Sequence, residues 1–214
     1  MNRSQQLRGT FQMTRHSLDF LRGKYILKRR RRCPYMSPVF YFGVLNLPRH
    51  HNQLLLMYTL INNITVQPPS TNCGQVCEQI LRALPGWFGI EESLVQYVKD
   101  ADSMPTMLVK DGEDVVGFLT IKKHFPESAD IHCMGILPKY HRTGTGRVLI
   151  QALENHLRDE GVKILQVKTV SADRNCDFYT KSRAFYKAVG FIPLEVFPTL
   201  WDEANPCLVL VKAL

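Results

Sequence analysis

The 214-residue sequence lacks a long hydrophobic run, a repeated Cys-x-x-Cys pair and, near its start, almost any acidic residue. Its longest apolar run, Leu54 to Ile61, is far shorter than the roughly 20 residues that a membrane-spanning helix needs, so we expect no membrane insertion. The cysteines show no paired metal-ligand spacing, so we expect no metal and free thiols in a reducing cytoplasm; they are Cys33, Cys73, Cys77, Cys133, Cys176 and Cys207.

The shortage of acids is confined to residues 1–62. This segment contains eleven lysines and arginines but only one acid, Asp19, which gives it a charge of +10. Because the whole chain carries +8, residues 63–214 carry −2 and are close to neutral. The basic character therefore belongs to the N-terminal segment, and we do not expect the remaining domain to bind nucleic acid.

Residues 1–62 also show no regular hydrophobic pattern. Lys28 to Arg32 form a basic block, and prolines interrupt the aromatic stretch beyond it. Three interpretations stay open: a disordered basic arm, an Arg-rich organellar transit peptide, or upstream sequence joined to the domain by an early start codon. We expect a poorly ordered extension over 1–62 and a folded domain over 63–214. The domain is expected in the cytoplasm, or in an organelle if the extension is a transit peptide.

From Asn63 the pattern becomes regular. The expected elements are a strand at 64–66, a helix capped by Thr71 or Asn72, a helix at 91–101, strands at 106–110, 115–124 and 130–137, a helix at 147–158, a strand at 164–170, a helix at 178–189, and two last strands, the second at 207–211 after a turn at Asn205-Pro206. The middle strands form an antiparallel meander, and one helical crossover adds a parallel pair. We therefore predict an α/β fold with a mixed, mostly antiparallel sheet flanked by helices.

A loop with two glycines connects an expected strand to an expected helix. It reads His141-Arg142-Thr143-Gly144-Thr145-Gly146-Arg147. Glycines at this spacing let the backbone turn tightly and expose its N–H groups, and the helix adds the positive end of its dipole. Such a loop can hold a phosphate or pyrophosphate, although a plain strand-to-helix turn has the same pattern.

This loop, the order of elements and the segment Phe185 to Phe191 together resemble the GNAT superfamily of acetyl-CoA-dependent N-acetyltransferases. The family loop reads Gln/Arg-x-x-Gly-x-Gly/Ala, and the later family signature is a tyrosine, three residues and Gly-Phe, here Tyr186, Gly190 and Phe191. The resemblance covers residues 63–214. The segments Leu84 to Ile90 and Phe197 to Trp201 also resemble a bacterial branch of the superfamily.

The resemblance implies that acetyl-CoA donates an acetyl group to a primary amine. The loop amides and helix dipole would hold the pyrophosphate, while the preceding strand, splayed by a bulge at Gly135, would pair with the pantetheine amides. A backbone N–H of that strand would steady the thioester oxygen. The cofactor-binding residues implied are Met134, Gly135, Ile136, Leu137, Arg142, Thr143, Gly144, Thr145, Gly146 and Arg147.

Three side chains are the candidate catalytic groups. Tyr186 matches the family tyrosine, which protonates the leaving thiolate. Asp130 is our first choice for the base that takes the amine's proton, because it matches a position where some family members place a catalytic glutamate. His132 is expected on the same strand face, and Glu127 or a water chain are further alternatives.

Two positions depart from the family pattern. His141 replaces the usual Gln or Arg, with Arg142 as a substitute beside it, and Thr180 replaces an Asn often found six residues before the tyrosine. The alternative function is a catalytically inactive module that senses coenzyme A, or that binds nucleic acid through the basic arm. The acceptor amine is not identified, and a homodimer is left open.

Overall fold

A computed structural model describes residues 63–214, which lie within one compact unit of the chain. The interpretations of the basic segment concern residues 1–62 and lie outside the described range. Within residues 63–214, no helix is long and apolar enough to cross a membrane.

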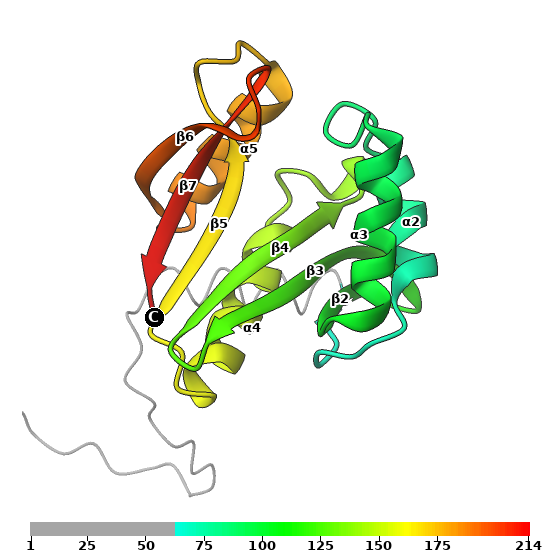
Figure 1. The fold of residues 1–214 in the computed structure, drawn as a ribbon. Helices are drawn as coiled ribbons and strands as arrows, with labels where there is room; N and C mark the ends of the chain where they lie inside the picture. The colour runs from blue at the N-terminus through cyan, green and yellow to red at the C-terminus, as the bar shows by residue number, and fades with distance from the viewer. Residues whose placement is uncertain (1–62) are drawn as a thin grey trace, which may run out of the picture. The chain divides into compact units, whose positions relative to one another are not determined.

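The described chain forms one seven-stranded sheet with helices on both faces (Figure 1). Its elements are β1 (Ile64–Val66), α2 (Gly74–Arg82), α3 (Glu91–Ser103), β2 (Thr106–Asp111), β3 (Asp114–Phe125), β4 (Ser128–Ile136), the 3₁₀ turn η1 (Pro138–Tyr140), α4 (Thr145–Asp159), β5 (Ile164–Val170), α5 (Asp177–Ala188), β6 (Ile192–Asp202) and β7 (Asn205–Ala213). The strand order is β1-β2-β3-β4-β5-β7-β6, and only the β4–β5 pair is parallel. The predicted element order and mixed, mostly antiparallel fold are confirmed.

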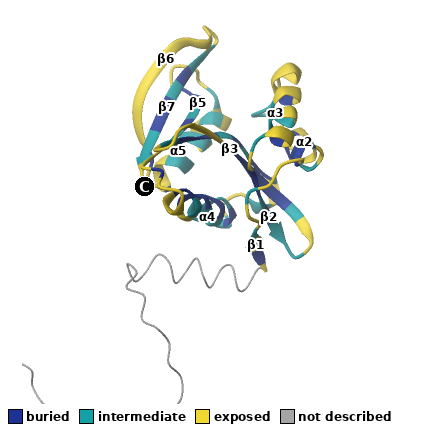
Figure 2. Cartoon of the chain, turned by 60° about the horizontal axis from the view of Figure 1, so that its bottom comes forward, coloured by how far each residue is buried: buried dark blue, intermediate teal, exposed yellow. Residues whose placement is uncertain are grey.

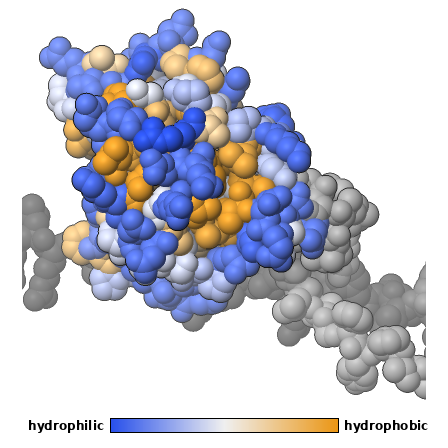
Figure 3. Space-filling model, turned by 90° about the vertical axis from the view of Figure 1, so that its right-hand side faces the viewer, coloured by the Kyte–Doolittle hydropathy of each residue, from blue (hydrophilic) through white to orange (hydrophobic). Residues whose placement is uncertain are grey.

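Helices α2 and α3 cover one face of the sheet, and α4 and α5 lie on the other (Figure 1). Strand β4 contributes to both layers: Ala129 and Ile131 join the core under α4, whereas Cys133 joins the core under α2 and α3. Regular alternation would put all three on one face, but the extra residue His132 between Ile131 and Cys133 inverts it. Buried residues accordingly concentrate on β2, β3 and β4 between the helices, while edge strand β6 is exposed throughout (Figure 2). From the side of α2 and α3, hydrophilic side chains surround the apolar ones (Figure 3).

Strands β4 and β5 are paired over only part of their length. Their parallel pairing runs from Ser128 opposite Ile164 to Ile131 opposite Val167, although β4 continues to Ile136 and β5 to Val170. Beyond Ile131 the two strands diverge (Figure 1). One edge of β4 is therefore open over its last five residues.

The bulge in β4 lies at His132, and the predicted bulge at Gly135 is wrong. Opposite β3, Ile131 pairs with Ile121 and Cys133 with Thr120, so His132 is the extra residue, whereas Gly135 pairs regularly with Phe118. A Cβ atom at Gly135 would lie 2.9 Å from the Phe118 ring. Gly135 is thus explained by close packing.

Three predicted element ends also differ from the structure. Helix α2 is not capped by Thr71 or Asn72, because its first amide, that of Gly74, donates to Oδ1 of Asp102 at 2.6 Å, on α3. Helix α4 begins at Thr145, two residues before the predicted start. The last hairpin turns before Asn205, whose side chain donates to the Asp202 carboxylate at 2.9 Å, and β7 starts at this residue.

A buried charge ties α4 to the last strand. Glu154 is 3% exposed; it forms an ion pair with Lys212 of β7 and accepts from Nη2 of Arg158 at 3.1 Å. The Glu154→Ala variant is expected to lose about 3 kcal/mol in free energy of unfolding, because the Lys212 ammonium would lose its anionic partner. Urea unfolding measures this loss. The Glu160→Ala variant, which removes a partly exposed ion pair with Lys123, should lose less than about 1 kcal/mol, and equal losses would contradict the expectation.

Candidate active site

The open edge of β4 presents backbone groups to the space between β4 and β5. The Leu137 amide donates to Val116 on β3 at 2.9 Å, whereas the Ile136 carbonyl points the other way and accepts from Nε2 of His141 at 2.7 Å. Because backbone groups alternate along a strand, Met134 and Ile136 both direct their N–H groups to the open side. Within residues 63–214 no backbone acceptor bonds these two amides, and only that of Met134 has another partner, the Cys133 thiol. An extended ligand can pair with this edge as an added strand.

The loop after β4 collects further unpaired amides. Gly144 is the N-cap residue of α4 with φ at 99°, and Arg142 also has a left-handed φ of 63°. In the described part of the chain, no acceptor bonds the amides of Arg142, Thr143, Gly144 and Gly146. Arg147 differs from the prediction, because its amide donates to the Gly144 carbonyl at 2.9 Å once the helix starts at Thr145. Unpaired amides of this kind beside the N-terminus of α4 make an expected anion site.

Gly146 lies where this loop, α5 and β4 meet. A Cβ atom there would lie 3.0 Å from Cε2 of Phe185 on α5 and 3.6 Å from Cε of Met134 on β4. The Thr143 hydroxyl donates to the Tyr140 carbonyl at 2.7 Å, which fixes the loop against the preceding turn. The expected anion site is thus held next to the open strand edge.

Tyr186 on α5 is half-buried between two aromatic rings. Its ring packs edge-on against Phe185 and Phe191, with centroids 5.3 and 5.6 Å away. Burial raises the pKa of Tyr186 well above its usual value, with smaller contributions from Cys133 and Asp130 of β4. Its hydroxyl makes no hydrogen bond within the described residues. The phenol therefore keeps its proton and has it available for a ligand.

Asp130 is 4% exposed and uses only one of its carboxylate oxygens. Its Oδ2 atom forms an ion pair with Lys168 and accepts from Nε2 of Gln166 at 3.3 Å, both on β5, with Nε2 of His124 3.5 Å away. Its Oδ1 atom is buried and has no hydrogen-bond partner among residues 63–214. A buried oxygen in this state needs a donor, such as the N–H of a ligand.

His132 contacts a residue that the sequence did not reveal as part of the site. Its Nε2 atom lies 2.7 Å from Oδ2 of Asp100 on α3. Although His132 and Asp130 come from the same strand, no contact joins their side chains within the described residues. The 32 residues between Asp100 and His132 leave no spacing signal for this pair.

Comparison with known proteins decides the family. Residues 75–191, more than half of the chain, match the model of the acetyltransferase (GNAT) family. The chain belongs to that family. The resemblance inferred from the loop and from Tyr186 is confirmed.

Among curated relatives, this GNAT chain is 31% identical over 99 residues to mycothiol acetyltransferase of Corynebacterium glutamicum (strain R). That match covers 46% of the chain but only 31% of the relative's length. A GNAT-family acetyltransferase from Desulfovibrio desulfuricans has a TM-score of 0.61 at 13% identity, covering 70% of this chain and 98% of that one. A GNAT acetyltransferase from Elizabethkingia anophelis with acetyl-CoA bound has a TM-score of 0.56 at 17% identity, covering 72% and 99%. At these identities the structures establish the shared fold.

The two departures from the GNAT pattern have structural roles in this chain. His141 bonds the Ile136 carbonyl, and its ring meets that of Trp87 edge-on with centroids 5.6 Å apart. Trp87, from the α2–α3 loop, donates from Nε1 to the Phe178 carbonyl of α5 at 3.1 Å. Thr180 donates to the carbonyl of Cys176, the N-cap residue of its helix α5. These contacts link the α2–α3 loop to α5 near the open strand edge.

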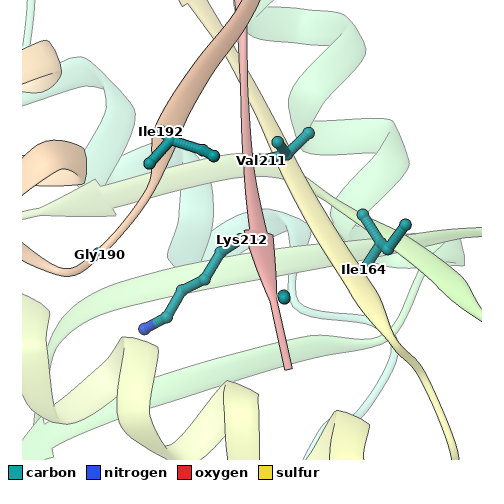
Figure 4. Close-up of a pocket in the computed structure, with 6 residues that line it drawn as sticks. Ile164, Gly190, Ile192, Val211 and Lys212 are labelled. Atoms are coloured by element: carbon teal, nitrogen blue, oxygen red, sulfur yellow. The ribbon is translucent and has the colours of Figure 1, made fainter. Parts of the chain in front are cut away.

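A separate pocket of about 230 Å³ lies on β5, β6 and β7 (Figure 4). It is lined by Ile164, Gly190, Ile192, Val211, Lys212 and Ala213. The lining is mainly apolar, and the ammonium of Lys212 already bonds Glu154 and the Val189 carbonyl. None of the candidate site residues lines this pocket, so it contributes nothing to the chemistry at β4. Among the described residues, no cluster of three His, Cys, Asp or Glu side chains could hold a metal.

Proposed function

We propose that this protein transfers the acetyl group of acetyl-CoA to a primary amine by direct attack on the thioester. The observation that carries the proposal is the open edge of β4, where the amides of Met134 and Ile136 adjoin the unpaired amides of the loop at Gly144. The edge suits the two amides of pantetheine, and the loop suits the pyrophosphate. Family membership supports acetyl-CoA as the donor.

The reaction breaks one bond and forms one. The amine nitrogen attacks the carbonyl carbon, a C–N bond forms, and the C–S bond breaks to release the thiolate of coenzyme A. Tyr186 gives its hydroxyl proton to that thiolate and recovers a proton from water. A strand amide, that of Met134 or Ile136, stabilises the negative charge on the thioester oxygen during the attack.

The proton lost by the amine goes to a group on β4. Both predicted candidates, Asp130 and His132, are largely buried on the strand that carries the open edge. The free Oδ1 atom of Asp130 can accept a hydrogen bond from the incoming amine. The relatives named mycothiol acetyltransferase support acetyl transfer, but their match is too short to assign their acceptor to this chain.

A panel of amines tests this function. The purified protein, incubated with acetyl-CoA and single amines, is expected to release coenzyme A thiol only in the presence of an accepted amine. A thiol-reactive dye follows the release, and mass spectrometry detects the acetylated amine. The panel should include polyamines, aminoglycosides, amino acids and peptide N-termini. Thiol release that does not depend on any amine, or the absence of release across the panel, would count against the proposal.

A further inference from the structure

A carboxylate from α3 holds the imidazole of His132 at the point where β4 separates from β5. The His132 and Asp100 side chains are 19% and 14% exposed, and their nearest atoms lie 2.7 Å apart. We propose that Asp100 positions His132 as the base that takes the proton of the acceptor amine. This proposal rests on the acetyl transfer proposed above and assigns one of its proton transfers.

The hydrogen bonds around Asp100 leave one nitrogen of His132 available. Oδ2 of Asp100 faces Nε2 of His132, and Oδ1 accepts from Nε2 of Gln96 at 2.8 Å. Both oxygens of Asp100 are thus engaged, so this carboxylate orients the ring and does not itself take the proton. Nδ1 of His132 has no partner within residues 63–214. A neutral imidazole that donates from Nε2 to a carboxylate presents a lone pair on Nδ1.

The backbone places His132 beside the reacting groups. His132 is the extra residue of the β4 bulge and directly follows Ile131, the last residue paired with β5. A bulge turns its side chain away from regular alternation, a device that is common next to active sites. Met134, whose amide faces the open side of β4, comes two residues later, which is roughly 7 Å along a strand.

The groups that contact His132 favour a positive charge on its imidazole ring. Tyr97 of α3 packs edge-on against it at 5.6 Å, and burial, with smaller effects from Cys133, Tyr179, Asp100 and Asp130, raises the pKa of Tyr97 to about 12. Tyr97 is therefore neutral near pH 7. Among the described residues, Asp100 is the anion that hydrogen-bonds His132. An imidazolium formed on His132 would be stabilised directly by that carboxylate.

Asp130 is less suited to take the same proton. Its Oδ2 atom already forms an ion pair with Lys168 of β5 and accepts from Gln166. Protonation of Asp130 would remove the anion opposite Lys168, whereas protonation of His132 adds a cation opposite Asp100. The first change loses an ion pair and the second creates one, so the geometry assigns the proton to His132.

The test compares kcat against pH for the wild type and for Asp100→Asn, His132→Gln and Asp102→Asn, with the best amine of the panel. Asp102→Asn is the matched control, because Asp102 lies on the same helix but bonds the Gly74 amide. We expect His132→Gln to lower kcat about 100-fold and to remove the acid limb of the profile, and Asp100→Asn to lower kcat roughly tenfold. Asp100→Asn should also change the acid limb, whereas Asp102→Asn should leave it as in the wild type, because of these two carboxylates only that of Asp100 contacts the His132 ring.

The acetyl-CoA-induced rise in melting temperature shows that each variant is folded. If Asp100→Asn keeps the wild-type kcat and acid limb, or changes no more than Asp102→Asn, Asp100 is a structural tie between α3 and β4 and the proposal is overturned. A wild-type protein that acetylates no amine would instead remove the proposed function itself. The two failures are therefore distinguishable.

Discussion

Replacing Gly144 with valine is expected to abolish the rise in melting temperature that acetyl-CoA gives the wild-type protein. Gly144 caps α4 with φ at 99°, a conformation that a β-branched residue adopts only at a cost of about 1–2 kcal/mol. Relief of that strain would rotate the unpaired amides on both sides of Gly144, so that they no longer point at the same anion. A ligand at 100 times its Kd stabilises a protein by about 2.7 kcal/mol, so losing the site is measurable by thermal unfolding.

Gly161 offers a matched control at the other end of the same helix. It has a similar φ of 81°, and a Cβ atom there would meet no atom within 4 Å. Gly161→Val should therefore lower the melting temperature by backbone strain while keeping the acetyl-CoA-induced rise. The Gly146→Val variant should lose the acetyl-CoA-induced rise, as Gly144→Val does, because the new side chain would press on Phe185. An unchanged rise in both loop variants would contradict the anion site.

Replacing Tyr186 with phenylalanine is expected to lower kcat by about 100- to 1,000-fold while acetyl-CoA still raises the melting temperature. The ring and its packing on Phe185 and Phe191 remain, and only the proton donor is lost. Steady-state kinetics and thermal unfolding together separate catalysis from binding. Tyr179→Phe is the control on the same helix, since it removes the hydroxyl that donates to the Trp87 carbonyl at 3.0 Å. It should lower stability and keep most of kcat, and equal kcat losses would remove Tyr186 from the mechanism.

The raised pKa of Tyr186 also fixes the sign of two pH effects. Because the folded pKa lies above the usual value near 10, Tyr186 stays protonated through neutral pH and causes no alkaline loss of kcat below pH 10. Its neutral form contributes stability that is fully present below about pH 10 and is lost as the pH rises through the folded pKa. Tyr186→Phe should therefore show a smaller alkaline loss of stability than the wild type, as measured by urea unfolding.

The sequence predicted features that depend on residues close together in the chain. Alternation and periodicity gave the order of elements, and the two glycines gave the loop before α4. Partners across the fold were not predictable in this way: Asp102 caps α2 from 28 residues away, and Lys168 reaches Asp130 across 38 residues. Periodicity shows which face a residue occupies but does not identify the neighbour on that face. The bulge at His132 was missed for a similar reason, because it is defined by register with β3 and carries no glycine.

Because β4 pairs with β5 over only a short length, the expected ligand would help to connect the two parts of the sheet. Four residue pairs, Ser128–Ile131 with Ile164–Val167, form the sheet pairing between β1–β4 and β5–β7 in the described chain. A bound pantetheine, paired with β4 beyond this ladder, would add a second connection between the two parts of the sheet. Occupancy by the donor is thus expected to stiffen the two half-sheets against each other. Slower amide hydrogen exchange with acetyl-CoA than without it, in both Met134–Leu137 and the end of β5, would support this expectation.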